Sequence, residues 1–213
     1  PKQVLVGQNF NLQTYAMPYF FYEGVYLGLV AIHDQKSDRV WTELAWSPDT
    51  INWTRIDVGN PLIPNSEIKL DYDYGCVYAC AAPIIKKDKI EIFYGSSDYR
   101  HNGWRNGSFS MATLRTDGFA GYKQINAKKE GVIITQNIKY NNGLLKINAD
   151  FNEKGSLKVT VLNKKGKEIA ISKTIKKTSM NQIVQFDRKI TENNISLKFN
   201  INDAKLYSFL IGK

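Results

Sequence analysis

The sequence predicts an all-β protein, a partial β-propeller of about two blades followed by an antiparallel β-sandwich. Two stretches about 65 residues apart, residues 17–56 and 82–125, share one pattern: a Pro-led apolar strand, a tight turn, a second apolar strand, a polar loop and a third strand. Repeated units of about four short strands are typical of propeller blades. After residue 125 the charge changes sign and strict alternation begins, which predicts a second domain. We therefore expect domains at residues 1–125 and 126–213.

The strands of the first repeat differ in how they should be covered. Val25–Ile32 is apolar at nearly every position, which predicts an inner strand buried on both faces, whereas Arg39–Trp46 alternates and should be half exposed. Tight turns at Glu23-Gly24 and Lys87-Asp88 join the first two strands of each repeat. We therefore expect the remaining loops to share the opposite face and to carry any site. These loops are residues 9–17, 33–38, 60–80 and 95–107.

The second domain alternates apolar and polar residues, as half-buried strands do. The apolar positions are Leu145, Ile147, Ala149 and Phe151, then Leu157, Val159 and Val161, and finally Ile195, Leu197, Phe199 and Ile201. Turn signals separate these runs at Asn142-Gly143, Lys154-Gly155, Lys165-Gly166 and Asn193-Asn194. Six or seven strands in this arrangement predict a two-sheet sandwich that residues 206–211 close.

The charge of the two parts excludes one class of partner. Residues 1–122 carry 11 basic and 13 acidic residues, whereas residues 123–213 carry 18 and 7, and 17 of those 18 are lysine. The second part lacks the arginines and interleaved aromatic residues that bind the bases and phosphates of nucleic acids. Its lysines occupy the solvent-exposed faces of the predicted strands. We therefore expect no nucleic-acid partner. Binding to acidic polymers would require retention on heparin at about half-molar salt, because diffuse lysines are screened.

Neither a disulfide, a metal nor a membrane span is predicted. Cys76 and Cys80 on one extended strand would lie about 13 Å apart, beyond the reach of a disulfide, and the pair alone falls short of four metal ligands. We assign no metal and no cofactor. The longest apolar run, Val25–Ile32, is far below the roughly 20 residues that a membrane span needs.

Three segments of the first part resemble a known group of enzymes. LAWSPDTINWTRI, DYDYGCVYACAAPIIKKDKIEIFYGSSDYRH and MATLRTDGFAGY resemble the later blades of five-bladed β-propeller glycoside hydrolases, broadly families 32 and 43. The segment GVIITQNIKYNNGLLKINADF resembles the start of the accessory β-sandwich that often ends such enzymes. The resemblance implies hydrolysis of glycosidic bonds in oligo- or polysaccharides by carboxylates at the propeller centre. It also favours an extracellular or periplasmic location.

The chain holds too few blades for that family. Five blades of about 60 residues need about 300 residues, and only about two fit before the sandwich. We therefore expect a fragment whose partner is the set of missing N-terminal blades of the same protein. Some catalytic acids of the family would then lie before Pro1.

Carboxylates at the loop face are the candidate catalytic residues. Asp73 and Asp98 are assigned to catalysis, since carboxylates about 5 to 9 Å apart suit glycoside hydrolysis. Asp34 occupies the place in the first repeat that Asp98 has in the second, and Asp71 lies two residues before Asp73, so both are assigned to substrate binding. Loop capping is the alternative role for all four.

Five further residues are assigned to substrate binding because they offer sugar-binding chemistry at the same face. Imidazole, guanidinium and phenol groups bind hydroxyls, and an indole stacks on a pyranose ring. The residues are Tyr15, Tyr78, Arg100, His101 and Trp104. The alternative function is a non-catalytic carbohydrate-binding or cell-surface interaction module that uses the same loops.

Overall fold

A computed structural model of the chain describes residues 1–212. These residues are all-β, with sixteen strands in two sheets and no helix, so none of them belongs to a helix able to cross a membrane. The chain divides into two compact units, one from Pro1 to Phe119 and one that begins at Ala120.

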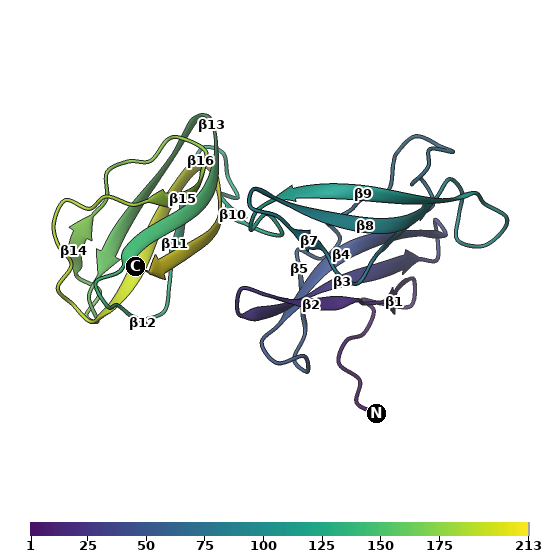
Figure 1. The fold of residues 1–213 in the computed structure, drawn as a ribbon, viewed down its shortest axis with the longest axis horizontal. Coiled ribbons are helices and arrows are strands. Elements are labelled where there is room, and N and C mark those ends of the chain that lie inside the picture. Colours follow the sequence, from purple (N-terminus) through teal and green to yellow (C-terminus); the bar gives the residue numbers. More distant parts are fainter. Residues whose placement is uncertain (213) are drawn as a thin grey trace. The chain divides into compact units, whose positions relative to one another are not determined.

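The first unit holds a nine-stranded sheet made of two antiparallel meanders, β1 to β5 and β6 to β9 (Figure 1). Its strands are β1 (Leu12–Ala16), β2 (Tyr19–Tyr22), β3 (Val25–Asp34), β4 (Arg39–Ser47), β5 (Thr54–Ile56), β6 (Cys76–Ala79), β7 (Ile84–Ile85), β8 (Lys89–Ser97) and β9 (Gly107–Arg115).

Each meander begins with a strand that is interrupted before a proline. β1 and β2 both pair with β3, and β6 and β7 both pair with β8. The interruptions precede Pro18 and Pro83, which have no N–H to donate to a strand ladder. Glu23 and Gly24, with φ of 44° and 90°, form the turn from β2 to β3, as a type I′ hairpin requires. The sequence repeat is therefore also a repeat of strand pairing.

The two meanders join at one parallel bridge, between Val40 of β4 and Cys76 of β6. Beside it, the buried Thr42 hydroxyl donates to the Val77 carbonyl at 3.0 Å. The Arg39 side chain donates to the Tyr74 and Ser66 carbonyls at 2.8 and 2.7 Å. These bonds hold the segment before β6 against the start of β4.

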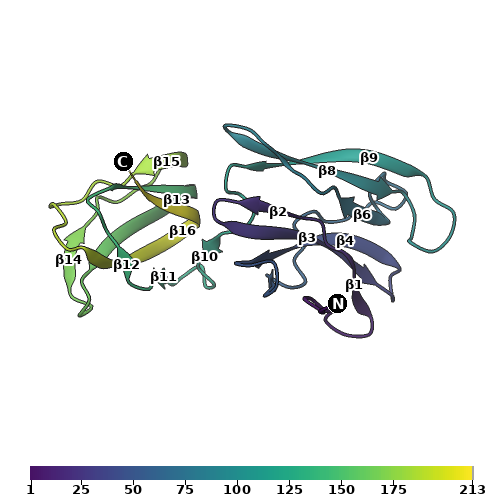
Figure 2. The same cartoon turned by 60° about the horizontal axis from the view of Figure 1, so that its bottom comes forward.

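β3 is covered on both faces, which confirms the prediction for this strand. Every residue of 27–32 is buried. Val30 and Ile32 pack with Ala45 on one face, while Ala31 packs with Val40 and Cys76 on the other. The half-exposed strand predicted for residues 39–46 is wrong, because residues 42–45 of β4 are all buried. Figure 2 shows β3 and β4 side by side, with the hairpin of β8 and β9 in the same unit.

The second unit holds a seven-stranded sheet organised around two long paired strands, β13 and β16. Its strands are β10 (Tyr122–Lys123), β11 (Gly131–Ile134), β12 (Ile138–Lys139), β13 (Leu144–Leu162), β14 (Glu168–Ile171), β15 (Ser179–Ile183) and β16 (Asn194–Gly212). β14 and β15 pair with opposite ends of β13, and β10, β11 and β12 pair with successive parts of β16.

The predicted turn at Lys154-Gly155 is wrong, because β13 runs through it. The strand instead shifts register between Phe151 and Ser156, while β16 continues opposite. A Cβ atom at Gly155 would overlap the backbone oxygen of Asp203, so this glycine serves a close approach of two backbones. The two predicted strands on either side are the two halves of β13.

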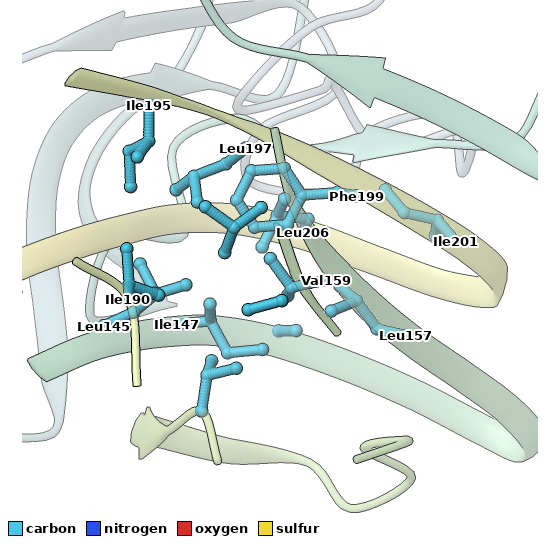
Figure 3. Packing of buried hydrophobic residues seen from close by; sticks show 14 of the residues in the cluster. Leu145, Ile147, Leu157, Val159, Ile190, Ile195, Leu197, Phe199, Ile201 and Leu206 are labelled. Carbon is cyan, nitrogen blue, oxygen red and sulfur yellow. The ribbon is translucent and has the colours of Figure 1, made fainter. Parts of the chain in front are cut away.

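The core of the second unit lies on one face of both halves of these strands. Leu145 and Ile147, from the first half of β13, belong to the same buried cluster as Leu157 and Val159 from the second (Figure 3). The predicted alternation is confirmed for these four side chains, which are buried, and for Lys146 and Lys158, which are not. Asn148 and Thr160, on the predicted polar face, are buried as well.

Candidate functional site

The links that follow β3 and β8 meet at one end of the first unit. The backbone N–H of His101 donates to the Asp38 carbonyl at 2.8 Å. The Asn102 backbone N–H donates to Asp38 Oδ2 at 2.8 Å, and the Asn102 side-chain amide donates to Oδ1 at 3.0 Å. Three hydrogen bonds between segments 64 residues apart therefore dock the β8–β9 loop on the β3–β4 turn.

A third segment, just before β6, also holds the β8–β9 loop in place. Gly75, just before β6, donates its N–H to the Ser97 carbonyl at 2.8 Å, and Val40 donates to the Gly75 carbonyl at 2.9 Å. A Cβ atom at position 75 would overlap the backbone of Tyr99. Only glycine therefore lets the 99–101 backbone lie this close, which places His101 near the first meander.

Two imidazoles and a carboxylate gather at this junction. His33, at the end of β3, is 4% exposed and its Nε2 lies 3.1 Å from Asp38 Oδ1. The His33 and His101 ring centroids are 4.8 Å apart. His33, Asp38 and His101 are called the His-Asp-His cluster below, and one nitrogen or oxygen of each lies within 4.8 Å of the others.

Tyr15 packs on both imidazoles of the cluster. Its ring centroid lies 4.7 Å from that of His33 and 5.1 Å from that of His101. β1 carries Tyr15 to this position, since Gln13, two residues before it, pairs with His33 in the sheet. The tyrosine contacts both imidazole rings and presents a half-exposed aromatic surface beside them.

Burial and hydrogen bonding set the charges around the cluster. Burial alone would raise the pKa of Asp38, but hydrogen bonds from the Asn102 backbone and from His33 outweigh it and lower the pKa. Burial is also the main cause that raises the pKa of Tyr78 to about 12 and that raises the pKa of the Cys76 thiol. At neutral pH the site therefore holds a carboxylate acceptor beside a protonated phenol.

This set of groups can bind hydroxyl-rich ligands, transfer protons or hold a cation. The carboxylate accepts hydrogen bonds, the phenols of Tyr15 and Tyr78 donate them, and an imidazole can do either according to its tautomer. Imidazole and carboxylate together are also ligands of divalent metals.

Of the residues assigned from sequence, Tyr15 and His101 lie together, with Tyr78 close by. Tyr78 packs against Ala31, Val40 and Cys76, beside the bridge that joins the two meanders. Arg100, next to His101, is exposed, and Trp104 in the same loop is 82% exposed. This loop therefore presents a free indole and a guanidinium near the cluster.

Asp34 and Asp98 hold equivalent turns. Asp34 accepts hydrogen bonds from the Ser37 hydroxyl at 2.7 Å and from the Lys36 backbone at 3.1 Å. Asp98 accepts from the Asn106 backbone at 2.9 Å and from the Asn106 side chain at 2.6 Å. These bonds lower the pKa of Asp98, which stays ionised. Both carboxylates close the link between the second and third strand of their meander.

Asp73 and Asp71 lie in the segment before β6. Asp73 is buried and accepts a hydrogen bond from the Tyr94 hydroxyl at 3.1 Å. Burial and that bond raise the pKa of Tyr94. Asp71 accepts a hydrogen bond from the Tyr72 backbone at 3.0 Å and the Tyr74 N–H bonds to its carbonyl. Neither aspartate belongs to the His-Asp-His cluster.

Sequence reasoning did not single out His33, Asp38 or Asn102. The chain contains only two histidines, and both lie in loops predicted to share one face. The shared face is the signal that could have identified both histidines. Asp38 gives no such signal, because an aspartate in a four-residue link between strands is common in ordinary turns.

Comparisons with known proteins give distant likenesses. No family model and no curated protein matches the sequence. Among solved structures, a family 32 β-fructofuranosidase of Bombyx mori is 11% identical, with a TM-score of 0.28, and the match covers 93% of this chain and 55% of that one. A family 43 arabinoxylan arabinofuranohydrolase of Bacillus subtilis is 11% identical, with a TM-score of 0.29 and coverage of 92% and 53%.

A third structure, described as a glycoside hydrolase, is 9% identical, with a TM-score of 0.34 and coverage of 96% and 61%. The chain therefore spans between 53% and 61% of the length of these three structures. Its structural neighbours are glycoside hydrolases of the family 32 and 43 type, at a level of similarity that assigns no activity to it.

Proposed function

We propose that this chain is the C-terminal part of a glycosidase. In this proposal residues 1–125 are the last two blades of a five-bladed propeller and residues 126–213 are its β-sandwich. The parent enzyme hydrolyses glycosidic bonds with carboxylates at the propeller centre. The remaining blades are the partner of this chain, its ligand is an oligo- or polysaccharide, and its location is extracellular or periplasmic.

One observation carries the proposal: two meanders with the same strand pairing bring their loops together at one end. Beside these loops, Tyr15 of β1 and Tyr78 of β6 lie close to His101 and the carboxylate of Asp38. Saccharide sites combine an aromatic surface with a few fixed hydrogen-bonding groups. The repeated strand pairing and the sequence resemblance support the blade assignment.

Trp104 is the residue expected to stack on the saccharide. We expect Trp104→Ala to weaken binding of the chain to its best glycan on an array by at least about tenfold, or 1.4 kcal/mol, because the indole supplies the largest apolar contact. The matched control is Tyr122→Ala, which removes another exposed aromatic side chain in the second unit. Equal binding by Trp104→Ala and the unchanged chain would contradict this role.

Asp73 and Asp98 are the carboxylates proposed for catalysis. In the longer protein that holds all blades, we expect Asp98→Asn or Asp73→Asn to lower the rate of reducing-sugar release by about a hundredfold or more, since acid and base groups contribute that much. Asp57→Asn, an equivalent change in another exposed turn, should leave the rate unchanged.

A non-catalytic carbohydrate-binding module is the second candidate function. It is favoured by the structural hydrogen bonds of both proposed carboxylates, Asp73 with Tyr94 and Asp98 with Asn106. Glycan binding that depends on Trp104, together with no sugar release by the longer protein, would establish this function in place of the glycosidase.

A further inference from the structure

The His-Asp-His cluster has the composition of a metal site. We propose that His33, Asp38 and His101 bind one divalent transition-metal ion of the first row, for which Zn²⁺ is the probe. This site goes beyond the proposed saccharide function and does not depend on it.

The spacing of the three residues is close to what a metal requires. Zinc bonds of about 2.0–2.2 Å at tetrahedral angles place two ligand atoms about 3.4 Å apart. His33 Nε2 and Asp38 Oδ1 are 3.1 Å apart, and the full set of ligand atoms lies within 4.8 Å. Binding therefore requires an approach of His101 by little more than 1 Å, which rotation of its half-exposed side chain can supply.

The protein leaves one nitrogen of His101 without a partner. Its Nδ1 atom is buried and has no hydrogen-bond partner among residues 1–212. A buried polar atom without a partner costs about 1–3 kcal/mol, and an ion beside His33 and Asp38 would satisfy it. His33 would bind the ion through Nε2, the nitrogen that faces Asp38, so its own Nδ1 is not a ligand.

The supporting contacts hold the ligands in place. Asn102 donates to both carboxylate oxygens of Asp38, and the His101 backbone is bonded to the Asp38 carbonyl. Tyr15 packs on both imidazole rings. Hydrogen bonds of the kind that Asp38 accepts from Asn102 orient metal ligands and raise affinity.

The ligand types select the class of metal. Imidazole nitrogen favours zinc, iron, cobalt, nickel and copper, whereas magnesium and calcium take oxygen ligands. Two imidazoles and one carboxylate supply three ligands and leave at least one position for water or a ligand. The ion would therefore lie at the loop end of the first unit with one coordination position open.

The first test uses the fact that the chain has only two histidines. The chain is prepared with Cys80→Ser, which removes the more exposed thiol, and is freed of metal with a chelator. One equivalent of Zn²⁺ should shift the imidazole proton resonances of both histidines in the NMR spectrum, and Co²⁺ should broaden both. Resonances that one equivalent of Zn²⁺ leaves unmoved would overturn the proposal.

The second test measures affinity by competition with a chromophoric chelator. In the same background, His101→Gln and Asp38→Asn should each weaken Zn²⁺ binding by at least about a hundredfold, because each removes a ligand. His101 is the better position to change, since it is less buried than His33. Asp57→Asn, with the same loss of charge outside the cluster, should bind Zn²⁺ as before. Equal affinity in His101→Gln and the control, or Mg²⁺ binding as tight as Zn²⁺ binding, would overturn the proposal.

Discussion

Replacing Arg55 by leucine is expected to lower the free energy of unfolding of the first unit by about 3–5 kcal/mol, because it leaves a buried carboxylate without its ion-pair partner. Glu43 is 0% exposed, and both Arg55 Nε, at 3.2 Å, and Arg55 Nη2 donate to its Oε2. Its other oxygen accepts from the Trp41 indole at 2.9 Å and from the Gly59 backbone at 3.3 Å.

Urea denaturation followed by tryptophan fluorescence measures this effect. All four tryptophans lie between residues 41 and 104, so the signal reports the first unit alone. Lys86→Leu is the matched control: it also removes a cation from a carboxylate, but Glu91 keeps Lys89 at 2.8 Å and both lysines are exposed. The control should unfold at the same urea concentration as the unchanged chain.

A double replacement separates charge from packing. Glu43→Leu combined with Arg55→Leu removes both charges, so the double variant should be more stable than Arg55→Leu alone. If Arg55→Leu unfolds at the same urea concentration as the unchanged chain, Glu43 gains no stability from its partner and the account of this buried pair is wrong.

The elements predicted best from sequence are those with a strong local pattern. The run Val25–Ile32 predicted a strand covered on both faces, and the alternation around Ile147 and Val159 predicted which side chains enter the core. In each case the pattern of neighbouring residues along one strand is enough to predict which side chains are buried, because successive side chains point to opposite faces of the sheet. Long-range pairing is not needed for such a prediction.

The errors arise where a distant segment overrides a local signal. Lys154-Gly155 has the composition of a turn, but β16 pairs along both sides of it, and the backbone of Asp203 approaches Gly155 closely. The chain therefore continues as one bent strand. Pairing with residues about 50 positions away decides this, and nothing in residues 152–156 indicates it.

The sequence predicted at which end of the first unit the candidate site lies, but only some of its residues. The two tight turns placed the loops of 33–38 and 95–107 at one end, and His101 with Tyr15 were assigned from their chemistry. The partnership of His33 with His101 spans 68 residues and depends on Gly75, whose missing Cβ lets the Tyr99 backbone approach. No local sequence pattern indicates that these two backbone segments approach each other.

Phe199→Ala is expected to lower the free energy of unfolding of the second unit by about 3–5 kcal/mol, through lost burial and the cavity it leaves. Phe199 is 1% exposed and is the largest fully buried side chain described. It pairs in β16 with Val159 of β13 and with Ile133 of β11, so its ring lies where both halves of the core meet (Figure 3). Few neighbours can fill a space so central to the cluster.

Far-UV circular dichroism during urea denaturation measures this change, because residues 120–212 contain no tryptophan. Phe209→Ala is the matched control on the same strand: it removes the same ring, 38% exposed and 5.5 Å from Phe199, and should cost less than half as much. The tryptophan transition of the first unit should not move in either variant, since each unit has its own core. An equal loss for both phenylalanines would show that burial at position 199 contributes nothing beyond general apolar contact, and a shifted tryptophan transition would show that the two units unfold together.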